Sequence, residues 1–226
     1  KNHTPQRPCR HRSRGHSREN EMRIVIASNN KGKIREIEKL LSSKNIEVIP
    51  QTQLQVPEIP ETGLTFVENS ILKARNACKH TNLPAIADDS GIEVDALSKK
   101  PGIYSARYAG PKATYAGNIA KLLQELRDIP APQRNARFQC VMVFLKSAED
   151  PTPIICQGTW EGEITFAPEG ANGFGYDSVF WAPTHKRTAA QLPPELKNKI
   201  SHRAQALQKM TSMLIARSAF CDEAIQ

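Results

Sequence analysis

The chain has 226 residues, 39% of them hydrophobic, and a formal net charge of +8, which suits one α/β domain of ordinary size with its own core. No apolar run reaches the ~20 residues that a membrane-spanning helix needs, so the sequence excludes an integral membrane protein. The five cysteines are scattered and form no C-x-x-C pair, a pattern that argues against a disulfide framework or a zinc site and favours a cytoplasmic setting.

Half of the net charge of +8 lies in residues 1–21, which carry six basic and two acidic residues. This segment has almost no large apolar residues and no periodicity, so we predict that it is disordered. We interpret it as an added or upstream extension and predict a single domain over residues 22–226. The basic tail leaves open a nucleic-acid-binding module, in which salt-dependent binding would vanish on deletion of the tail, but we expect no dedicated nucleic-acid partner.

The first elements read as an α/β unit. Residues 23–28 form a β-branched strand, and apolar residues at helical spacing from Ile34 to Leu41 follow a polar turn. Residues 47–50 read as a second short strand. A capping-box pattern that begins at Thr65, followed by an apolar stripe, predicts a helix over residues 65–80.

In the second half, residues 85–87 form a strand that we expect to end in a turn at residues 88–91, with residues 92–94 extended. Apolar spacing predicts a helix around residues 119–126. Residues 138–145 and 154–166 read as long strands of an antiparallel hairpin, and a final helix covers residues 195–215. We therefore predict a mixed β-sheet flanked by helices.

The first candidate site is the loop from residue 28 to residue 33, where a strand gives way to a helix. A triphosphate would suit this loop because free backbone N–H groups and the positive end of the helix dipole lie there. Two lysines add positive charge, and a glycine allows the backbone to approach the phosphates. The loop lacks the Walker A pattern, so a P-loop kinase or NTPase is disfavoured. An ordinary polar turn remains the alternative. The residues are Ser28, Asn29, Asn30, Lys31, Gly32 and Lys33.

The second candidate is the acidic pair Asp88 and Asp89, followed by Ser90. Magnesium takes one or two carboxylates and leaves room for phosphates and waters, and a carboxylate there could accept the proton of an attacking water. The same residue types also make ordinary turns.

Polar groups around the 65–80 helix form a third set. Glu61 lies just before the helix, and Asn69, Lys73 and Asn76 share the face opposite the apolar stripe. Lys73 could reach a phosphate, although a solvated surface lysine is the common alternative.

Two further segments suit a purine base. Around Phe174, two glycines imply a tightly shaped loop that presents an aromatic face for stacking, with packing of the aromatics into the core as the alternative. Early in the last helix, the side chains of His202 and Arg203 offer hydrogen-bond donors that would suit a base with oxygen acceptors. The alternative is that these residues simply form a basic helix surface. The segments are Phe174-Gly175-Tyr176-Asp177, Lys197 and Ser201-His202-Arg203.

Together and in this order, these segments resemble the inosine/xanthosine triphosphate pyrophosphatase family, from about Met22 to the end of the last helix. Two more phrases add to the resemblance: Glu61-Thr62-Gly63-Leu64-Thr65-Phe66 and Pro101-Gly102-Ile103-Tyr104-Ser105-Ala106-Arg107-Tyr108.

The resemblance implies an elongated mixed sheet with two lobes around a substrate cleft, a homodimer, and cleavage of ITP, dITP and XTP between the α and β phosphates. Residues 28–33, Lys73 and Ser90 would contact the phosphates, and residues 174–177, Lys197, His202 and Arg203 the purine. Asp89 would be the proton acceptor and a Mg²⁺ ligand, with Glu61 and Asp88 assisting at the metal. A relative that acts on modified pyrimidine nucleotides remains a rival.

Overall fold

A single mixed sheet organises the computed structural model of the protein, which describes residues 22–41 and 46–223. The strands are β1 (Met22–Ile26), β2 (Ile46–Pro50), β3 (Ala85–Val94), β4 (Asn135–Leu145), β5 (Ile154–Ile164), β6 (Phe180–Ala182) and β7 (Arg187–Thr188). Their order is β2-β1-β3-β4-β5-β6-β7. Because β1 pairs parallel with β2 and β3 while the other neighbours are antiparallel, the predicted mixed sheet and its β4–β5 hairpin are confirmed.

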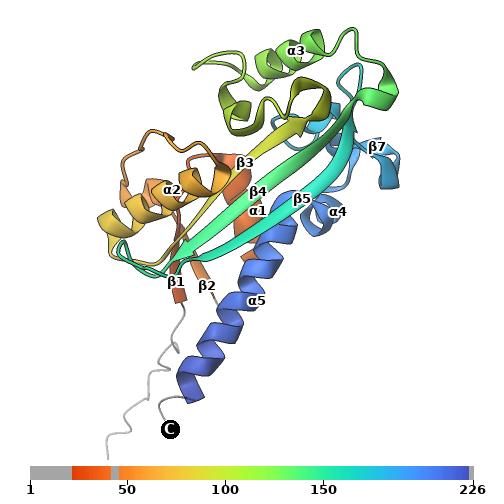
Figure 1. Ribbon diagram of the computed structural model, residues 1–226. Helices are drawn as coiled ribbons and strands as arrows, with labels where there is room; N and C mark the ends of the chain where they lie inside the picture. The colour runs from red at the N-terminus through yellow and green to blue at the C-terminus, as the bar shows by residue number, and fades with distance from the viewer. Residues whose placement is uncertain (1–21, 42–45, 224–226) are drawn as a thin grey trace, which may run out of the picture.

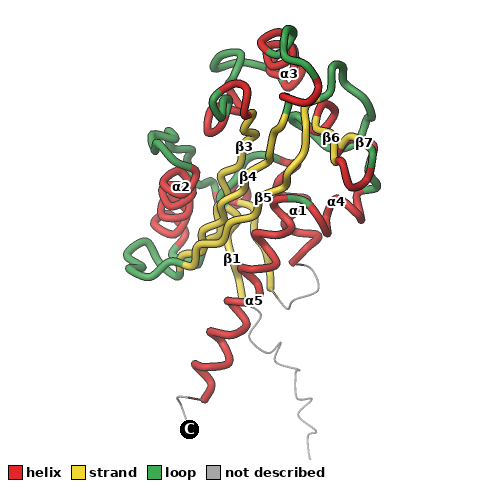
Figure 2. Tube along the Cα trace, turned by 45° about the vertical axis from the view of Figure 1, so that its right-hand side comes forward, coloured by secondary structure: helices red, strands yellow, loops and turns green. Residues whose placement is uncertain are grey.

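The α-helices of the described residues cover both faces of this sheet. They are α1 (Lys31–Leu41), α2 (Phe66–Thr81), α3 (Tyr115–Glu125), α4 (Pro194–Ile200) and α5 (His202–Glu223). Figures 1 and 2 show α2 on one side of the strands and α1 with α5 on the other. Each face has a core of its own: Ala74 and Ala77 of α2 pack with Ala87 of β3, whereas Ile37 of α1 and Leu207 of α5 pack with Ile86 of β3.

The three long strands also carry a second lobe. Beyond the ends of β1 and β2, strands β3 to β5 continue toward α3, β6 and β7 (Figure 1). A separate cluster there packs Ile92, Leu122, Phe138, Trp160 and Phe180 together. The two lobes therefore share strands β3 to β5, and these strands form the surface between the lobes.

The turn predicted at residues 88–91 is wrong, because β3 continues through it. The register with β4 is unbroken, with Asp88 opposite Met142 and Gly91 opposite Gln139. The antiparallel ladder satisfies the backbone of these turn-forming residues. On its other edge β3 meets β1 at Ala85 and Ile86, and beyond them the loop after β1 separates from the strand.

The single final helix that the pattern predicts is also wrong, because it is divided at Ser201. That residue is extended, with φ −65° and ψ 158°, and its Oγ accepts a hydrogen bond from Ala204 N at 3.2 Å. Serine is a favoured N-cap residue, so it ends α4 and starts α5 in a new direction. His202 and Arg203 consequently lie in the first turn of α5, where both are buried.

Within the described ranges, no helix combines the length and the apolar character that crossing a bilayer requires. The predicted disordered tail, residues 1–21, lies outside the described residues.

Candidate active site

A cavity of about 840 Å³ opens between the two lobes, within the size range of small-molecule sites. Most of the predicted site residues line it: Ser28, Asn29, Asn30, Lys33, Glu61, Lys73, Asp89, Ser90, Phe174, Gly175, Tyr176, Asp177, Lys197, His202 and Arg203. Lys31, Gly32 and Asp88 do not line it. Lys31 is exposed at the start of α1, and Asp88 is buried behind the cavity wall.

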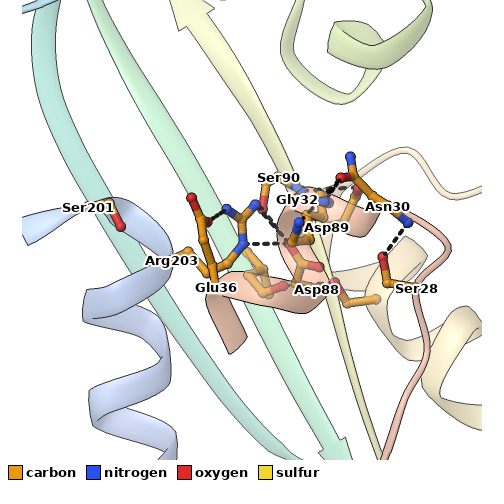
Figure 3. Close-up of polar contacts among 12 residues, drawn as sticks. Ser28, Asn30, Gly32, Glu36, Asp88, Asp89, Ser90, Ser201 and Arg203 are labelled. Carbon is orange, nitrogen blue, oxygen red and sulfur yellow. Dashed lines mark hydrogen bonds and ion pairs between the residues drawn. The ribbon is translucent and has the colours of Figure 1, made fainter. Parts of the chain in front are cut away.

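The loop between β1 and α1 forms one end of the cavity. Asn30 caps the helix, since its Oδ1 accepts hydrogen bonds from Gly32 N at 2.9 Å and Lys33 N at 3.2 Å. Its own N donates to Ser28 Oγ at 3.2 Å (Figure 3). The positive end of α1 is thus held at the cavity by side-chain contacts within the loop, an arrangement that attracts anions.

Asp88 and Asp89 point to opposite faces of the sheet, because successive side chains of a strand alternate. Asp88 lies on the face of α1 and α5, where its Oδ2 is 3.0 Å from Lys33 Nζ and 3.3 Å from Arg203 Nη2. Ser90 Oγ donates to the same oxygen at 2.7 Å. Burial acts to raise the pKa of Asp88, but the charges of Lys33 and Arg203 outweigh it and hold that pKa well below its usual range.

Asp89 lies on the face of α2 in a different environment. Its Oδ2 accepts a hydrogen bond from Asn69 Nδ2 at 3.1 Å, and its Oδ1 is 3.4 Å from Lys73 Nζ. Burial raises the pKa of Asp89 above its ordinary value although Lys73 and Lys33 act to lower it. The two adjacent carboxyls therefore differ in environment: the charges of Lys33 and Arg203 favour the ionised form of Asp88, whereas burial disfavours that of Asp89.

Glu61 completes an acidic pair with Asp89 around one cation. Lys73 Nζ lies 2.8 Å from Glu61 Oε1 and 3.4 Å from Asp89 Oδ1. Burial acts to lower the pKa of Lys73, but the charges of Asp89 and Glu61 raise it overall, so the lysine is a full cation. Arg107 Nη1 also contacts Glu61, at 3.1 Å from Oε2.

The loop that carries Phe174 lines another part of the cavity. Asp177 Oδ2 accepts hydrogen bonds from Phe174 N at 2.8 Å and from Lys197 Nζ at 2.5 Å, which fixes the loop. Lys197 Nζ lies 5.1 Å and Arg203 Cζ 5.7 Å from the centroid of the Phe174 ring. Tyr176 instead packs into the core of the upper lobe, where its hydroxyl donates to the carbonyl of Ser105 at 2.8 Å.

His202 is buried beside this loop. Its ring stacks on Phe138 with centroids 4.7 Å apart, and its Nδ1 has no hydrogen-bond partner in the part of the chain that the structure describes. Burial, followed by the charges of Arg203 and Lys197, sets the pKa of His202 well below its ordinary value. The imidazole is therefore neutral.

The loop of Phe174 contacts the start of α1 at Gly32. A Cβ on this residue would lie 2.6 Å from Cδ1 of Phe174, so only a glycine allows the ring to rest against the start of α1. Gly32 therefore contributes to the site through its missing side chain, even though it does not line the cavity.

Glu36, Arg107 and Tyr115 are among the residues at the site that were not predicted. Glu36 contacts Arg203 (Figure 3) and also Lys197, at 3.1 Å. Its position three residues after Lys33 on one helix places both on the same side, a signal that the pattern did contain. Arg107 and Tyr115 reach the cavity from the upper lobe, and no local spacing indicates that placement.

Comparison with known proteins adds independent information. The Ham1 family model matches residues 24–213. The dITP/XTP pyrophosphatase of Vibrio cholerae serotype O1 is 54% identical over 188 residues, which cover 83% of this chain and 94% of the relative. The dITP/XTP pyrophosphatase of Escherichia coli K12 is 54% identical over 192 residues, which cover 85% of this chain and 98% of the relative.

Solved structures agree with this similarity. A HAM1 protein from Coxiella burnetii superposes with a TM-score of 0.81 at 51% identity, over 86% of this chain and 99% of that one. A nucleoside-triphosphatase / dITP/XTP pyrophosphatase from Mycobacterium abscessus gives a TM-score of 0.67 at 42% identity, over 84% of this chain and 98% of that one.

Proposed function

Because this chain belongs to the Ham1 family, we propose that it hydrolyses the deaminated purine nucleotides dITP, ITP and XTP to the nucleoside monophosphate and pyrophosphate. The enzyme would thereby remove these nucleotides from the pool before they enter DNA or RNA. Its close relatives are named dITP/XTP pyrophosphatases, and they are similar over nearly their whole length.

One geometric observation carries the proposal beyond the names. A single cavity is lined by the anion-binding loop before α1, by the proton acceptor Asp89 and by the aromatic loop of Phe174. These three features match the three parts of a nucleoside triphosphate: a charged chain, a reacting phosphorus and a flat base.

The chain's own residues divide the chemistry. Asp89 accepts the proton of a water that attacks a phosphorus atom of the α–β anhydride; the bond from that phosphorus to the bridging oxygen breaks, and the monophosphate and pyrophosphate separate. Lys33, Lys73 and Ser90, with the start of α1, stabilise the negative charge on the phosphates. We also propose that the other residues of this loop contact the phosphates: Ser28, Asn29, Asn30 and Lys31.

Magnesium fits the acidic pair of this site. Glu61 and Asp89 already flank the Lys73 ammonium, so their oxygens converge on a position that favours a cation. Within the described residues no three His, Cys, Asp or Glu side chains form a metal-binding group, and one or two carboxylates with phosphates and waters are what magnesium commonly takes. When bound, the ion would neutralise phosphate charge. The assignment of Asp88 as a third ligand stays a prediction, since its carboxylate lies on the opposite face.

The base would lie against Phe174 within reach of donors. Lys197, His202 and Arg203 line that end of the cavity, and a base with an exocyclic amine would place donor against donor there. Residues 174–177 would shape this subsite, because Asp177 fixes the backbone of the loop.

Product analysis tests the reaction directly. The purified chain is incubated with magnesium and, separately, ITP, XTP, dITP, ATP and GTP, and nucleotides and pyrophosphate are resolved. We expect monophosphate and pyrophosphate from the first three, with ATP and GTP nearly untouched. Diphosphate and orthophosphate would contradict the placement of the triphosphate. No turnover of any purine by folded protein would favour the pyrimidine-acting rival.

Three coarser features complete the proposal. We expect a homodimer from the family, and light scattering during size-exclusion chromatography measures the molar mass of the assembly. Residues 22–226 would act as one catalytic domain, and deletion of residues 1–21 should leave turnover unchanged. The scattered cysteines, of which Cys78, Cys140 and Cys156 are free and buried, suit a cytoplasmic location.

A further inference from the structure

Tyr115 is an aromatic residue that neither the motifs nor the mechanism above uses. It is the first residue of α3, directly after the N-cap Thr114, whose Oγ1 accepts a hydrogen bond from Gly117 N at 3.1 Å. Its side chain is 48% exposed, yet it lines the cavity between the lobes. Figure 1 shows α3 in the upper lobe, far along the chain from the loop of Phe174.

The Tyr115 ring faces the Phe174 ring across the cavity. Their centroids are 6.3 Å apart and their planes differ by 39°. A flat base in contact with a ring on each side needs about 3.5 Å per contact, or about 7 Å in all. An outward movement of about 1 Å, with rotation toward parallel planes, would therefore admit a base between them.

The contact that now holds Tyr115 is weak enough to allow this movement. Asn30 Nδ2 donates to the Tyr115 hydroxyl at 3.4 Å, which is long for a hydrogen bond. The Oδ1 of Asn30 is already engaged with the start of α1, so the loop would keep its cap if the contact opened.

We propose that Tyr115 is the second wall of the base subsite and that the purine base stacks between its ring and that of Phe174. The inference rests on the proposed function and extends it to a residue of the upper lobe. Because the wall contacts the base equally before and during the reaction, it contributes to binding rather than to the chemical step.

Binding of the two product halves separates this role from others. Calorimetry with magnesium measures IMP, which carries the base, and pyrophosphate, which does not. Stacking of a base on an aromatic side chain is worth about 1–3 kcal/mol. For a half-exposed wall we expect Tyr115→Ala to weaken IMP binding about 5- to 30-fold and to leave pyrophosphate binding within about twofold. Tyr115→Phe keeps the ring and should bind both ligands as the wild type does.

Kinetics gives a second readout with a matched control. Tyr115→Ala should raise KM for ITP by a similar factor and leave kcat nearly unchanged. Phe166→Ala removes another exposed aromatic residue, one that does not line the cavity, and its KM should stay at the wild-type value.

Other outcomes would overturn the inference in recognisable ways. IMP affinity of Tyr115→Ala within twofold of the wild type would show that the base does not use this wall. Weakened binding of both ligands would show that Tyr115 acts through the Asn30 loop instead. If the wild type bound neither IMP nor pyrophosphate, the proposed function would fail with it.

Discussion

Replacement of Asp89 by asparagine is the sharpest test of the chemistry. The amide keeps the shape of the side chain and an oxygen that can accept the hydrogen bond of Asn69 Nδ2, but it cannot accept a proton from water. A positioned general base contributes about 10²- to 10⁴-fold to a rate. We therefore expect kcat for ITP to fall at least about 100-fold in Asp89→Asn.

The same substitution should not unfold the protein. The pKa of Asp89 is raised by burial, which means that the folded state disfavours its charge relative to the unfolded state. A neutral asparagine removes that unfavourable charge near neutral pH. Stability should therefore be equal to or above that of the wild type, and thermal unfolding followed by circular dichroism measures it.

Asp150→Asn is the matched control. Asp150 is a buried aspartate in the β4–β5 connection, where its carboxylate accepts hydrogen bonds from Lys146 N at 3.0 Å and Thr152 N at 2.9 Å. It does not line the cavity, so this variant should keep its kcat while its stability falls. An Asp89→Asn enzyme that kept a tenth of the wild-type kcat would refute Asp89 as the base.

Three further substitutions test other parts of the structure. Gly32→Ala places a methyl group 2.6 Å from Cδ1 of Phe174, so we expect weaker IMP binding in calorimetry with little change in stability; unchanged IMP affinity would separate Phe174 from the base. His202 is neutral in the folded protein, but in the unfolded chain it takes up a proton below about pH 6.5. The free energy of unfolding, measured by urea titration, should therefore fall as the pH drops below that value, by up to about 1.4 kcal/mol per pH unit. His202→Gln should reduce this slope. Arg134 donates four hydrogen bonds to backbone carbonyls. Because a buried acceptor left unpaired costs about 1–3 kcal/mol, Arg134→Ala should lower the free energy of unfolding by about 2–4 kcal/mol. A loss below about 0.5 kcal/mol, on the order of an ordinary surface substitution, would contradict this structural role of Arg134.

The sequence predicts most elements because their apolar spacing is regular, and it fails where side chains from distant elements override local preference. Residues 88–91 look like a turn because Asp, Ser and Gly are turn residues. They form a strand because Lys33 from α1, Arg203 from α5 and Lys73 from α2 compensate the two carboxylates. No window of sequence around β3 contains those partners.

The site shows the same division. The sequence motifs of the site could be recognised because each is a short local pattern. The direction in which their side chains point depends on the sheet that carries them. Adjacent carboxylates in a turn would suit one ion, whereas in a strand Asp88 and Asp89 face opposite sides. Arg107 and Tyr115 reach the cavity only because the long strands carry the upper lobe over it, and that geometry has no signature in their neighbours.

The buried charges that link the two ends of the cavity point to function rather than to stability. Arg203 contacts both Asp88 and Glu36 (Figure 3). Lys33 contacts the same Asp88, and Lys197 the same Glu36. Buried ion pairs often stabilise a fold no better than apolar side chains of the same size, so stability alone does not explain such a chain. It runs from the phosphate loop to the base loop, and a shift of any one charge weakens the buried ion pairs that it makes with its neighbours. The distance between the two subsites is therefore fixed before a nucleotide arrives, which reduces the ordering cost of binding.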